Sequence, residues 1–449
     1  MIKVKTLALS VSAALAWGAI GSAHAATTTQ QVADLKAQVA ELQEIVQALS
    51  GEQRQQAVQL RQQAEMAAAK PAPVAPVASS SKPGWMTLPD GKTQVKLYGS
   101  VRVDATYDTK GGNASTTNVN NNTNNVPLNS ANATQGNLNV TAATSRIGLD
   151  IVRPTERGDL IGKIEADFMG SNGTNGDGSF RVRHAYMSLN NWLAGQTTSP
   201  FVNADTMPET VDFNGAMGGG TKRTVQVRYT QPLTANQKLL VALEGGSVDN
   251  FSGTSQTTGG GRFPALTARY DITTADKKAL VQVHGLAHEN RVSTNDSNDE
   301  TKMAWGLGIG AKYSLTPHDT VFANYYHVKG DNRYMLYSDN SYAVTGSPVT
   351  GFNVYQSESD SGLIGYAHKW SPQWRSTVAA GAIWYKSSND FAAAAPTQNK
   401  TLYNVLANSF YSPVPGVDLG IEYTYGQRED FNTNKGDYSR VGLMAKYNF

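Results

Sequence analysis

The chain has 449 residues, of which 40% are hydrophobic, and it contains no cysteine. The absence of cysteine excludes thiol chemistry and disulfide cross-links, and a formal net charge of only +2 gives no reason to expect nucleic acid or another polyanion as a partner. After the N-terminal segment, no apolar run approaches the ~20 residues that a membrane-spanning helix needs. If the chain crosses a membrane, it therefore crosses it with strands.

The first 25 residues have the pattern of a cleaved secretory signal peptide. Lys3 and Lys5 precede an apolar core from Leu7 to Ile20, and Ala23-His24-Ala25 supplies the small residues of a cleavage site. A membrane anchor is the alternative, but the apolar core is too short for a spanning helix. We expect residues 1–25 to direct export.

The next segment, residues 26–69, predicts an α-helical coiled coil in the periplasm. Apolar residues recur at intervals of three and four over three heptads, at Val32, Leu35, Val39, Leu42, Val46 and Leu49. A single amphipathic helix that lies against the membrane-spanning part of the chain is the alternative. Valine at every a position with leucine at every d position nominally favours two strands, but tethering to a larger membrane domain that forms trimers can override a small bias. We therefore expect a homotrimer.

Residues 70–94 form the predicted boundary between this helix and the rest of the chain. The stretch KPAPVAPVASSSK from Lys70 to Lys82 is rich in Pro, Ala and Ser, a composition that favours an extended and semi-rigid spacer. The segment is a linker without chemistry of its own.

Residues 95–449 predict an all-β transmembrane barrel of about sixteen antiparallel strands. The last strand shows the pattern most clearly, because Val441, Leu443, Ala445, Tyr447 and Phe449 alternate with polar residues such as Arg440 and Lys446. Such alternation, with short turns at one end and long polar loops at the other, is typical of bacterial outer-membrane barrels. A count of eighteen stays open if the loop from Gly330 to Gln356 contains a hairpin.

The alternation also predicts which charged residues face the lumen. Arg102 and Asp104 share the polar face of the first strand, and the same parity places many further charges inside. Most of these are expected to be structural ion pairs, as a polar wall requires. The candidates for solute contact are basic residues near mid-height that lack a neutralising neighbour. They are Arg102, Arg146, Arg181 and Arg183, with Lys163 as a further lumen-lining residue, whereas Arg228, Arg269 and Arg375 fall near the periplasmic end.

The segment 198–221 predicts a loop that folds into the lumen and narrows it. It carries Asp205, Glu209 and Asp212 between stiff prolines and a glycine run. An ordinary surface loop is the alternative. A loop with carboxylates opposite a wall with arginines would set up a transverse field, and arginine suits this role because its planar fork stays charged and pairs bidentately.

Three stretches resemble the DcaP-like family of outer-membrane porins. They are SRIGLDIVRPTERGDLIGKIEADF from Ser145, RVRHAYMSLNNWLAGQT from Arg181 and MPETVDFNG from Met207. The resemblance implies a trimeric barrel with an N-terminal periplasmic coiled coil that admits dicarboxylates and related anions. The Asn/Thr-rich first loop and the distal loops carry no comparable pattern.

Other constellations are weak. His284 and His288 share a face but lack a third ligand, so we expect no metal site. No arrangement of nucleophile and base suggests an enzyme, and we expect no cofactor. The sequence thus favours a passive outer-membrane porin with small anionic solutes and outer-membrane lipid as its partners, and no nucleic acid. The alternative is a structural or adhesive surface protein that uses the barrel as an anchor.

Overall fold

The structure is a computed structural model that describes residue 40 and residues 83–113, 123–130, 133–170, 178–246, 251–252, 257–260, 262–294, 299–347 and 349–449. The chain divides into two compact units, Met1–Pro76 and Val77–Phe449. The predicted signal peptide, the coiled coil apart from Ala40, and the linker up to residue 82 lie outside the described residues. The account below concerns the second unit.

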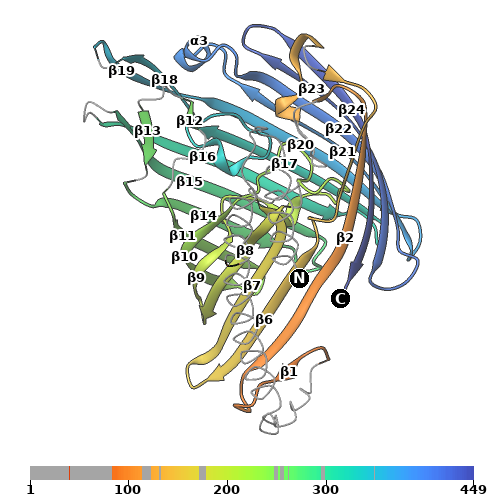
Figure 1. Cartoon of the computed structure of the whole chain (residues 1–449). Coiled ribbons are helices and arrows are strands. Elements are labelled where there is room, and N and C mark those ends of the chain that lie inside the picture. Colours follow the sequence, from red (N-terminus) through yellow and green to blue (C-terminus); the bar gives the residue numbers. More distant parts are fainter. Residues whose placement is uncertain are drawn as a thin grey trace. The chain divides into compact units, whose positions relative to one another are not determined.

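The second unit is a closed antiparallel barrel. Each long strand pairs with the next along the chain, and the last pairs with the first, with Arg102 opposite Lys446 (Figure 1). In the described residues sixteen long strands form this wall, which confirms the predicted count. They are β2 (Gln94–Lys110), β6 (Arg146–Thr155), β7 (Gly158–Gly170), β8 (Ser179–Leu189), β9 (Trp192–Thr198), β10 (Arg223–Thr234), β11 (Gln237–Glu244), β14 (Ala265–Thr273), β15 (Ala279–Thr294), β16 (Asp299–Ser314), β17 (Asp319–Lys329), β20 (Glu358–Lys369), β21 (Trp374–Tyr385), β22 (Asn399–Tyr411), β23 (Val417–Asp430) and β24 (Lys435–Asn448).

Shorter elements lie at the strand ends and in the connections. The loop between β17 and β20 does contain a hairpin, but it forms a separate sheet in which β18 pairs with β12, so the barrel count stays at sixteen. The shorter strands are β1 (Met86–Thr87), β3 (Gly112–Asn113), β4 (Ala133–Thr134), β5 (Asn137–Thr141), β12 (Phe251–Ser252), β13 (Thr257–Gly260), β18 (Tyr342–Ser347) and β19 (Gly351–Gln356). The short helices are η1 (Thr123–Asn125), η2 (Leu128–Ser130), η4 (Ala204–Thr206), η5 (Asn332–Tyr334) and α3 (Asp390–Ala394).

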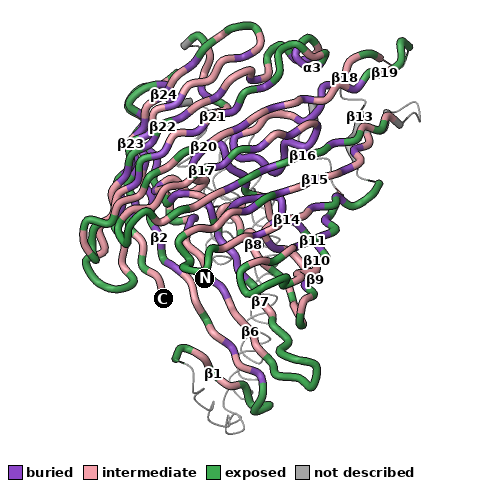
Figure 2. Tube along the Cα trace, turned by 180° about the vertical axis from the view of Figure 1, so that it is seen from behind, coloured by how far each residue is buried: buried purple, intermediate pink, exposed green. Residues whose placement is uncertain are grey.

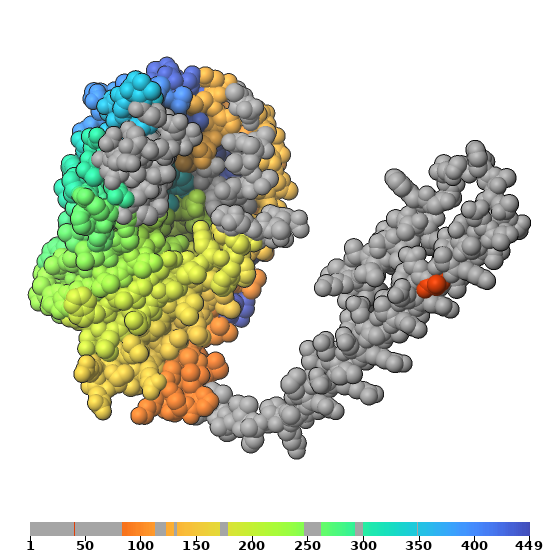
Figure 3. Space-filling model, turned by 60° about the vertical axis from the view of Figure 1, so that its left-hand side comes forward, coloured from red at the N-terminus to blue at the C-terminus, as the bar shows by residue number. Residues whose placement is uncertain are grey.

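The outer face of the barrel is apolar and the inner face is polar. Burial alternates along the strands (Figure 2), and large apolar side chains such as Val101, Ile364 and Leu443 are exposed on the outside. The yellow and green strands show one side of this wall as a continuous surface (Figure 3). Aromatic residues border this apolar surface at the end of the barrel that has the short turns. Trp374 and Tyr411 are one such pair, with ring centroids 4.6 Å apart. An apolar band with aromatic borders is the outer surface that a lipid bilayer requires.

No helix among the residues that the structure describes is long and apolar enough to cross a membrane.

Candidate functional site

The connection between β9 and β10 packs against the inside of the barrel. Phe201 is fully buried there, with its ring centroid 5.6 Å from that of Tyr326 and 5.5 Å from that of Tyr334. Further along, the backbone approaches the wall so closely that a Cβ on Gly381 would lie 2.0 Å from the carbonyl oxygen of Met217. Gly381 lies in the middle of β21, where strands normally avoid glycine. Its missing side chain leaves the space that the loop backbone occupies.

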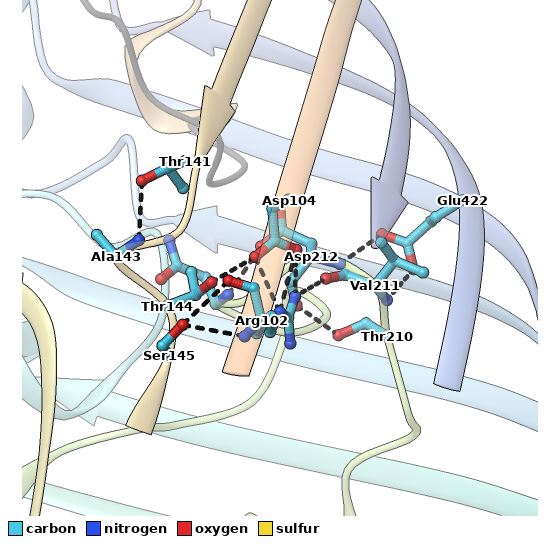
Figure 4. A network of polar contacts seen from close by, with 11 residues as sticks. Arg102, Asp104, Thr141, Ala143, Thr144, Ser145, Thr210, Val211, Asp212 and Glu422 are labelled. Carbon is cyan, nitrogen blue, oxygen red and sulfur yellow. Dashed lines mark hydrogen bonds and ion pairs between the residues drawn. The ribbon is translucent and has the colours of Figure 1, made fainter. Parts of the chain in front are cut away.

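Polar contacts fix the same loop at intervals. The carboxylate of Glu209 accepts two hydrogen bonds from Arg375, at 2.7 and 2.8 Å. The main-chain N–H groups of Val211 and Asp212 donate to the carboxylate of Glu422 at 2.9 and 3.1 Å (Figure 4). Because Glu422 is buried on the inner face of β23, these two bonds hold the loop tip against the wall.

The sequence predicted that the three loop carboxylates lie opposite the mid-height arginines. This prediction is wrong for two of them. Glu209 pairs with Arg375, and Asp205 lies 3.8 Å from Arg269. Arg269 and Arg375, which the sequence placed near the periplasmic end, receive these loop carboxylates instead. The loop follows the wall from β14 to β23, and only its tip, with Asp212, reaches β2 and the mid-height arginines.

Arg102 connects that tip to β2, which is separated from β23 by β24 alone. Its guanidinium binds Asp104, with the shortest contact at 2.6 Å, and it donates a hydrogen bond of 2.6 Å to the carbonyl oxygen of Val211 (Figure 4). Thr144 donates to the same aspartate at 2.6 Å. Only 10% of the Arg102 side chain is exposed, so this residue positions the loop and is poorly placed to meet a solute.

Arg181 and Arg183 share the carboxylates of β7. Arg183 binds Glu165 at 2.7 Å and Asp167 at 2.8 Å, whereas Arg181 binds Asp167 through two nitrogens at 2.8 and 2.7 Å. The two arginines differ in exposure, because the Arg183 side chain is 9% exposed and that of Arg181 is 40% exposed. Arg181 can therefore reach a passing solute while it stays bound to the wall.

Arg146 is the least neutralised of the predicted arginines. Its nearest carboxylate among the described residues is Glu165, at 4.0 Å, and 35% of its side chain is exposed. Arg146 is paired with Asp167 in the ladder, and Asp167 is paired with Arg181. Since neighbouring strands lie ~4.8 Å apart, the backbones of Arg146 and Arg181 are about 10 Å apart with an acid between them.

Lys163 and Lys446 are further basic residues of the inner face. Lys163 contacts Asp150 at 2.7 Å and donates to the hydroxyl of Tyr98 at 2.8 Å, so it is satisfied by the wall. Lys446 has no carboxylate within 4.0 Å in the part of the chain that the structure describes, and it pairs with Arg102 across the β2–β24 ladder. The sequence placed Lys446 in the polar row of the last strand but did not single it out as a site residue.

The ring of Phe213 lies over this group of arginines. Its centroid is 5.4 Å from the guanidinium carbon of Arg102, 5.2 Å from that of Arg146 and 5.6 Å from that of Arg183. These distances are within the range of cation–π attraction. Phe213 was missed because a single aromatic residue in a loop has no periodic pattern to mark it.

We define the arginine wall as Arg102, Arg146, Arg181, Arg183 and Lys446 with the carboxylates of Asp104, Glu165 and Asp167. Five basic and three acidic side chains leave an excess of two positive charges. The expectation that the mid-height arginines lack neutralising neighbours is wrong for Arg102, Arg181 and Arg183, because the acids lie on the same or the neighbouring strand. The excess charge comes from Arg146 and Lys446.

Within the described residues, no group of three or more His, Cys, Asp or Glu side chains is arranged to hold a metal ion. The ring Nδ1 of His284 donates a hydrogen bond of 2.9 Å to the carbonyl oxygen of Pro200, and His288 contacts Asp331 at 2.9 Å. Both histidines thus have partners within the protein.

The model of the DcaP outer membrane protein family matches residues 20–449. The chain belongs to this family. Among solved structures, the outer membrane channel DcaP of Acinetobacter baumannii is 35% identical, with a TM-score of 0.73 over 80% of this chain and 98% of that one. As a member of the DcaP family, the protein is an outer-membrane channel and not an enzyme.

More distant porins share the fold of this DcaP family member. The anion-selective porin from Comamonas acidovorans is 10% identical with a TM-score of 0.52, over 80% of this chain and all of that one. OmpF of Salmonella typhi, solved with daunomycin, is 12% identical with a TM-score of 0.51, over 80% of this chain and 98% of that one. A search of curated proteins found no match.

Proposed function

We propose that this channel passes small anions by passive diffusion and that dicarboxylates are among its solutes. The observation that carries the proposal is the excess positive charge of the arginine wall beside the loop tip. Arg146 is part-exposed with no carboxylate of the described residues closer than 4.0 Å, and Arg181 is 40% exposed although it binds Asp167, while Arg102 and Arg183 are buried in ion pairs. A solute that crosses at this level meets positive charge that the wall has not neutralised.

The spacing of the exposed groups favours a solute with two carboxylates. Arg146 and Arg181 lie on either side of Asp167, with about 10 Å between their backbones. A short diacid can contact both guanidinium groups, and the apolar ring of Phe213 lies beside that of Arg146 to accept the carbon chain. Asp167 between the two arginines weakens the attraction, as release of the solute requires.

Single-channel recording with a salt gradient tests the proposal directly. The purified full-length protein in a planar bilayer should give a reversal potential that indicates anion preference, and liposomes that contain it should admit a diacid faster than a neutral solute of equal size. A reversal potential that indicates cation preference would contradict the proposal. No observation favours the alternative of an adhesive protein with the barrel as an anchor.

We also propose a homotrimer whose N-terminal helices associate in the periplasm. The support is the porin-sized barrel together with the heptads of residues 32–49. Deleting residues 26–70 should weaken the assembly without abolishing the barrel, because contacts between barrels remain. A native mass of one or two chains in mild detergent would contradict the trimer.

A further inference from the structure

A second loop, the one between β17 and β20, also folds into the lumen. Its residues 331–337 are all buried, whereas loops usually run over the surface of a protein. The ring centroid of Tyr334 lies 5.5 Å from that of Phe201 in the β9–β10 loop, and both rings belong to one buried cluster with Tyr326 on the inner face of β17. We call residues 331–341 the inner segment, because they pack against the β9–β10 loop inside the barrel.

Main-chain hydrogen bonds join the inner segment to the β9–β10 loop. The two run antiparallel and form a β-bridge. On one side of the bridge, the N–H of Thr221 donates to the carbonyl oxygen of Tyr334 at 3.0 Å. On the other side, the N–H of Leu336 donates to the carbonyl oxygen of Gly219 at 3.1 Å. The two loops therefore satisfy each other's buried backbone groups, as neighbouring strands do.

Two tyrosine hydroxyls of the inner segment add side-chain bonds. The hydroxyl of Tyr337 donates to the carbonyl oxygen of Gly215 in the β9–β10 loop at 2.6 Å. The hydroxyl of Tyr334 donates to the carboxylate of Glu244 at 2.9 Å, and the same carboxylate accepts from Ser199 at 2.6 Å. Glu244 at the end of β11 thus holds both loops.

The two loops cover one side of the inner wall. The inward side chains of six neighbouring strands, β15 to β22, are buried behind them, and examples from each strand in turn are His284, Ala304, Tyr326, Leu363, Ile383 and Leu406. On β6, β7 and β8, by contrast, the side chains of Arg146, Lys163 and Arg181 are 35%, 25% and 40% exposed. The open part of the lumen therefore lies beside the arginine wall.

We propose that the inner segment is a second constriction element. Together with the β9–β10 loop it fills the part of the lumen in front of β15 to β22, so that solutes pass only along the arginine wall. Tyr334 and Tyr337 are positioning residues, because both are buried and act by holding the two loops together. The consequence for selectivity rests on the proposed function, whereas the consequence for the width of the channel does not.

Planar-bilayer recording of the full-length protein, with liposome uptake of a diacid and of a neutral solute of the same size, tests this proposal. Replacing residues 333–337 by Gly-Ser-Gly-Ser-Gly removes the buried side chains of the inner segment and keeps the length of the chain. Tyr334→Phe with Tyr337→Phe is a milder variant that keeps both rings and removes only their hydroxyl bonds. Circular dichroism and native mass show whether each variant is folded and assembled.

The matched control for the milder variant is Tyr326→Phe with Tyr342→Phe. Both tyrosines are fully buried, so the control removes the same number of buried hydroxyl groups. The hydroxyl of Tyr326 has no hydrogen-bond partner among the residues that the structure describes, and that of Tyr342 donates to the carbonyl oxygen of Gly330 in its own loop. Neither bond joins the inner segment to the β9–β10 loop.

We expect the replacement variant to conduct roughly 1.5-fold more than the wild type, since six of the sixteen strands regain part of a free inner face. Its uptake of the diacid relative to the neutral solute should fall, because a path away from the arginine wall opens. The variant with two phenylalanines should show excursions to higher conductance at least about tenfold more often than the wild type, since each hydrogen bond that is lost shifts such an equilibrium about fivefold. The control should behave as the wild type does.

Unchanged conductance in a folded replacement variant would overturn the proposal, and so would a control whose excursions are as frequent as those of the test variant. Raised conductance with an unchanged ratio of diacid to neutral uptake would refute the confinement of solutes to the arginine wall. A wild type that prefers neither solute would contradict the proposed function instead, and the conductance measurements would then decide the role of the inner segment.

Discussion

Replacing Arg146 and Arg181 together by alanine should remove most of the proposed anion preference. These are the exposed members of the arginine wall, at 35% and 40% of their side chains. Neither substitution leaves a buried acid alone, because Asp167 and Glu165 remain bound to Arg183. The variant therefore changes the charge of the constriction while the wall keeps its internal ion pairs.

The size of the effect follows from the exposure of the two groups. A carboxylate 4 Å from a guanidinium gains about 1 kcal/mol at the dielectric constant of water and about 4 kcal/mol at an effective value of 20. With more than a third of each side chain exposed, the lower value applies. Two such contacts amount to about 2 kcal/mol, or roughly a 30-fold change in the local occupancy of a diacid.

The assay is the reversal potential in a salt gradient, together with the uptake of a diacid and of a neutral solute of the same size. The matched control is Arg153→Ala with Arg157→Ala, which removes the same charge from the short-turn end of the β6–β7 hairpin, where both residues are exposed. The reasoning is refuted if the control shifts the reversal potential as much as the test variant does. Alanine at Arg102 or Arg183 is no substitute test, because it would leave buried carboxylates unpaired.

Two further predictions concern the loop between β9 and β10, and a third concerns Asp339 in the connection between β17 and β20. Deleting residues 203–216 should raise single-channel conductance markedly, and unchanged conductance in a folded variant would place this loop outside the pore. Phe213→Ala should give a smaller rise and leave the sign of ion selectivity as it is, because the arginines remain, whereas reversed selectivity would contradict this. Burial raises the pKa of Asp339 to about 6, so the protonated carboxyl favours the folded state, and its contribution is lost as pH rises from about 4 through 6. Thermal unfolding followed by circular dichroism should show that loss, and Asp339→Asn should flatten it; an identical pH profile in the variant would exclude Asp339 as the cause.

The barrel could be predicted from the sequence because its signal is periodic. The alternation of Val441, Leu443 and Ala445 with polar residues specifies both a strand and its faces. The ambiguity between sixteen and eighteen strands had a physical basis. The loop from Gly330 to Gln356 does form a hairpin of two strands, β18 and β19, and the pairing of β18 with β12 in a separate sheet shows that this hairpin lies outside the barrel.

The candidate site could be predicted only in part. The face of the strand on which a side chain lies follows from the local sequence, whereas its ion-pair partner on another strand does not. Alternation puts Arg102 and Asp104 on one face, and in the structure they form an ion pair. The pairing of Arg183 with Glu165 depends in addition on the register of β7 and β8, which shifts at a bulge beside Glu165. The register between β7 and β8 cannot be derived from this single sequence.

The path of the loop was beyond sequence reasoning for a related reason. Glu209 reaches Arg375 because the loop follows the wall around the lumen, guided by glycines such as Gly381 that leave room for its backbone. Loop residues have no fixed side-chain period, so nothing in the sequence links a carboxylate of residues 198–221 to one arginine in preference to another.

These pairings bear on how a channel can attract anions and still release them. A wall of five unpaired cations would bind a diacid tightly, and bound solute would block conduction. In the arginine wall the acids neutralise the buried cations, Arg102 and Arg183, and leave Arg146 and Arg181 exposed on either side of Asp167. Each carboxylate of a solute therefore gains one exposed guanidinium and is repelled by an acid on the neighbouring strand. By this reasoning Asp167 matters for release as much as the arginines do for recruitment, and the balance between them sets the residence time of the solute.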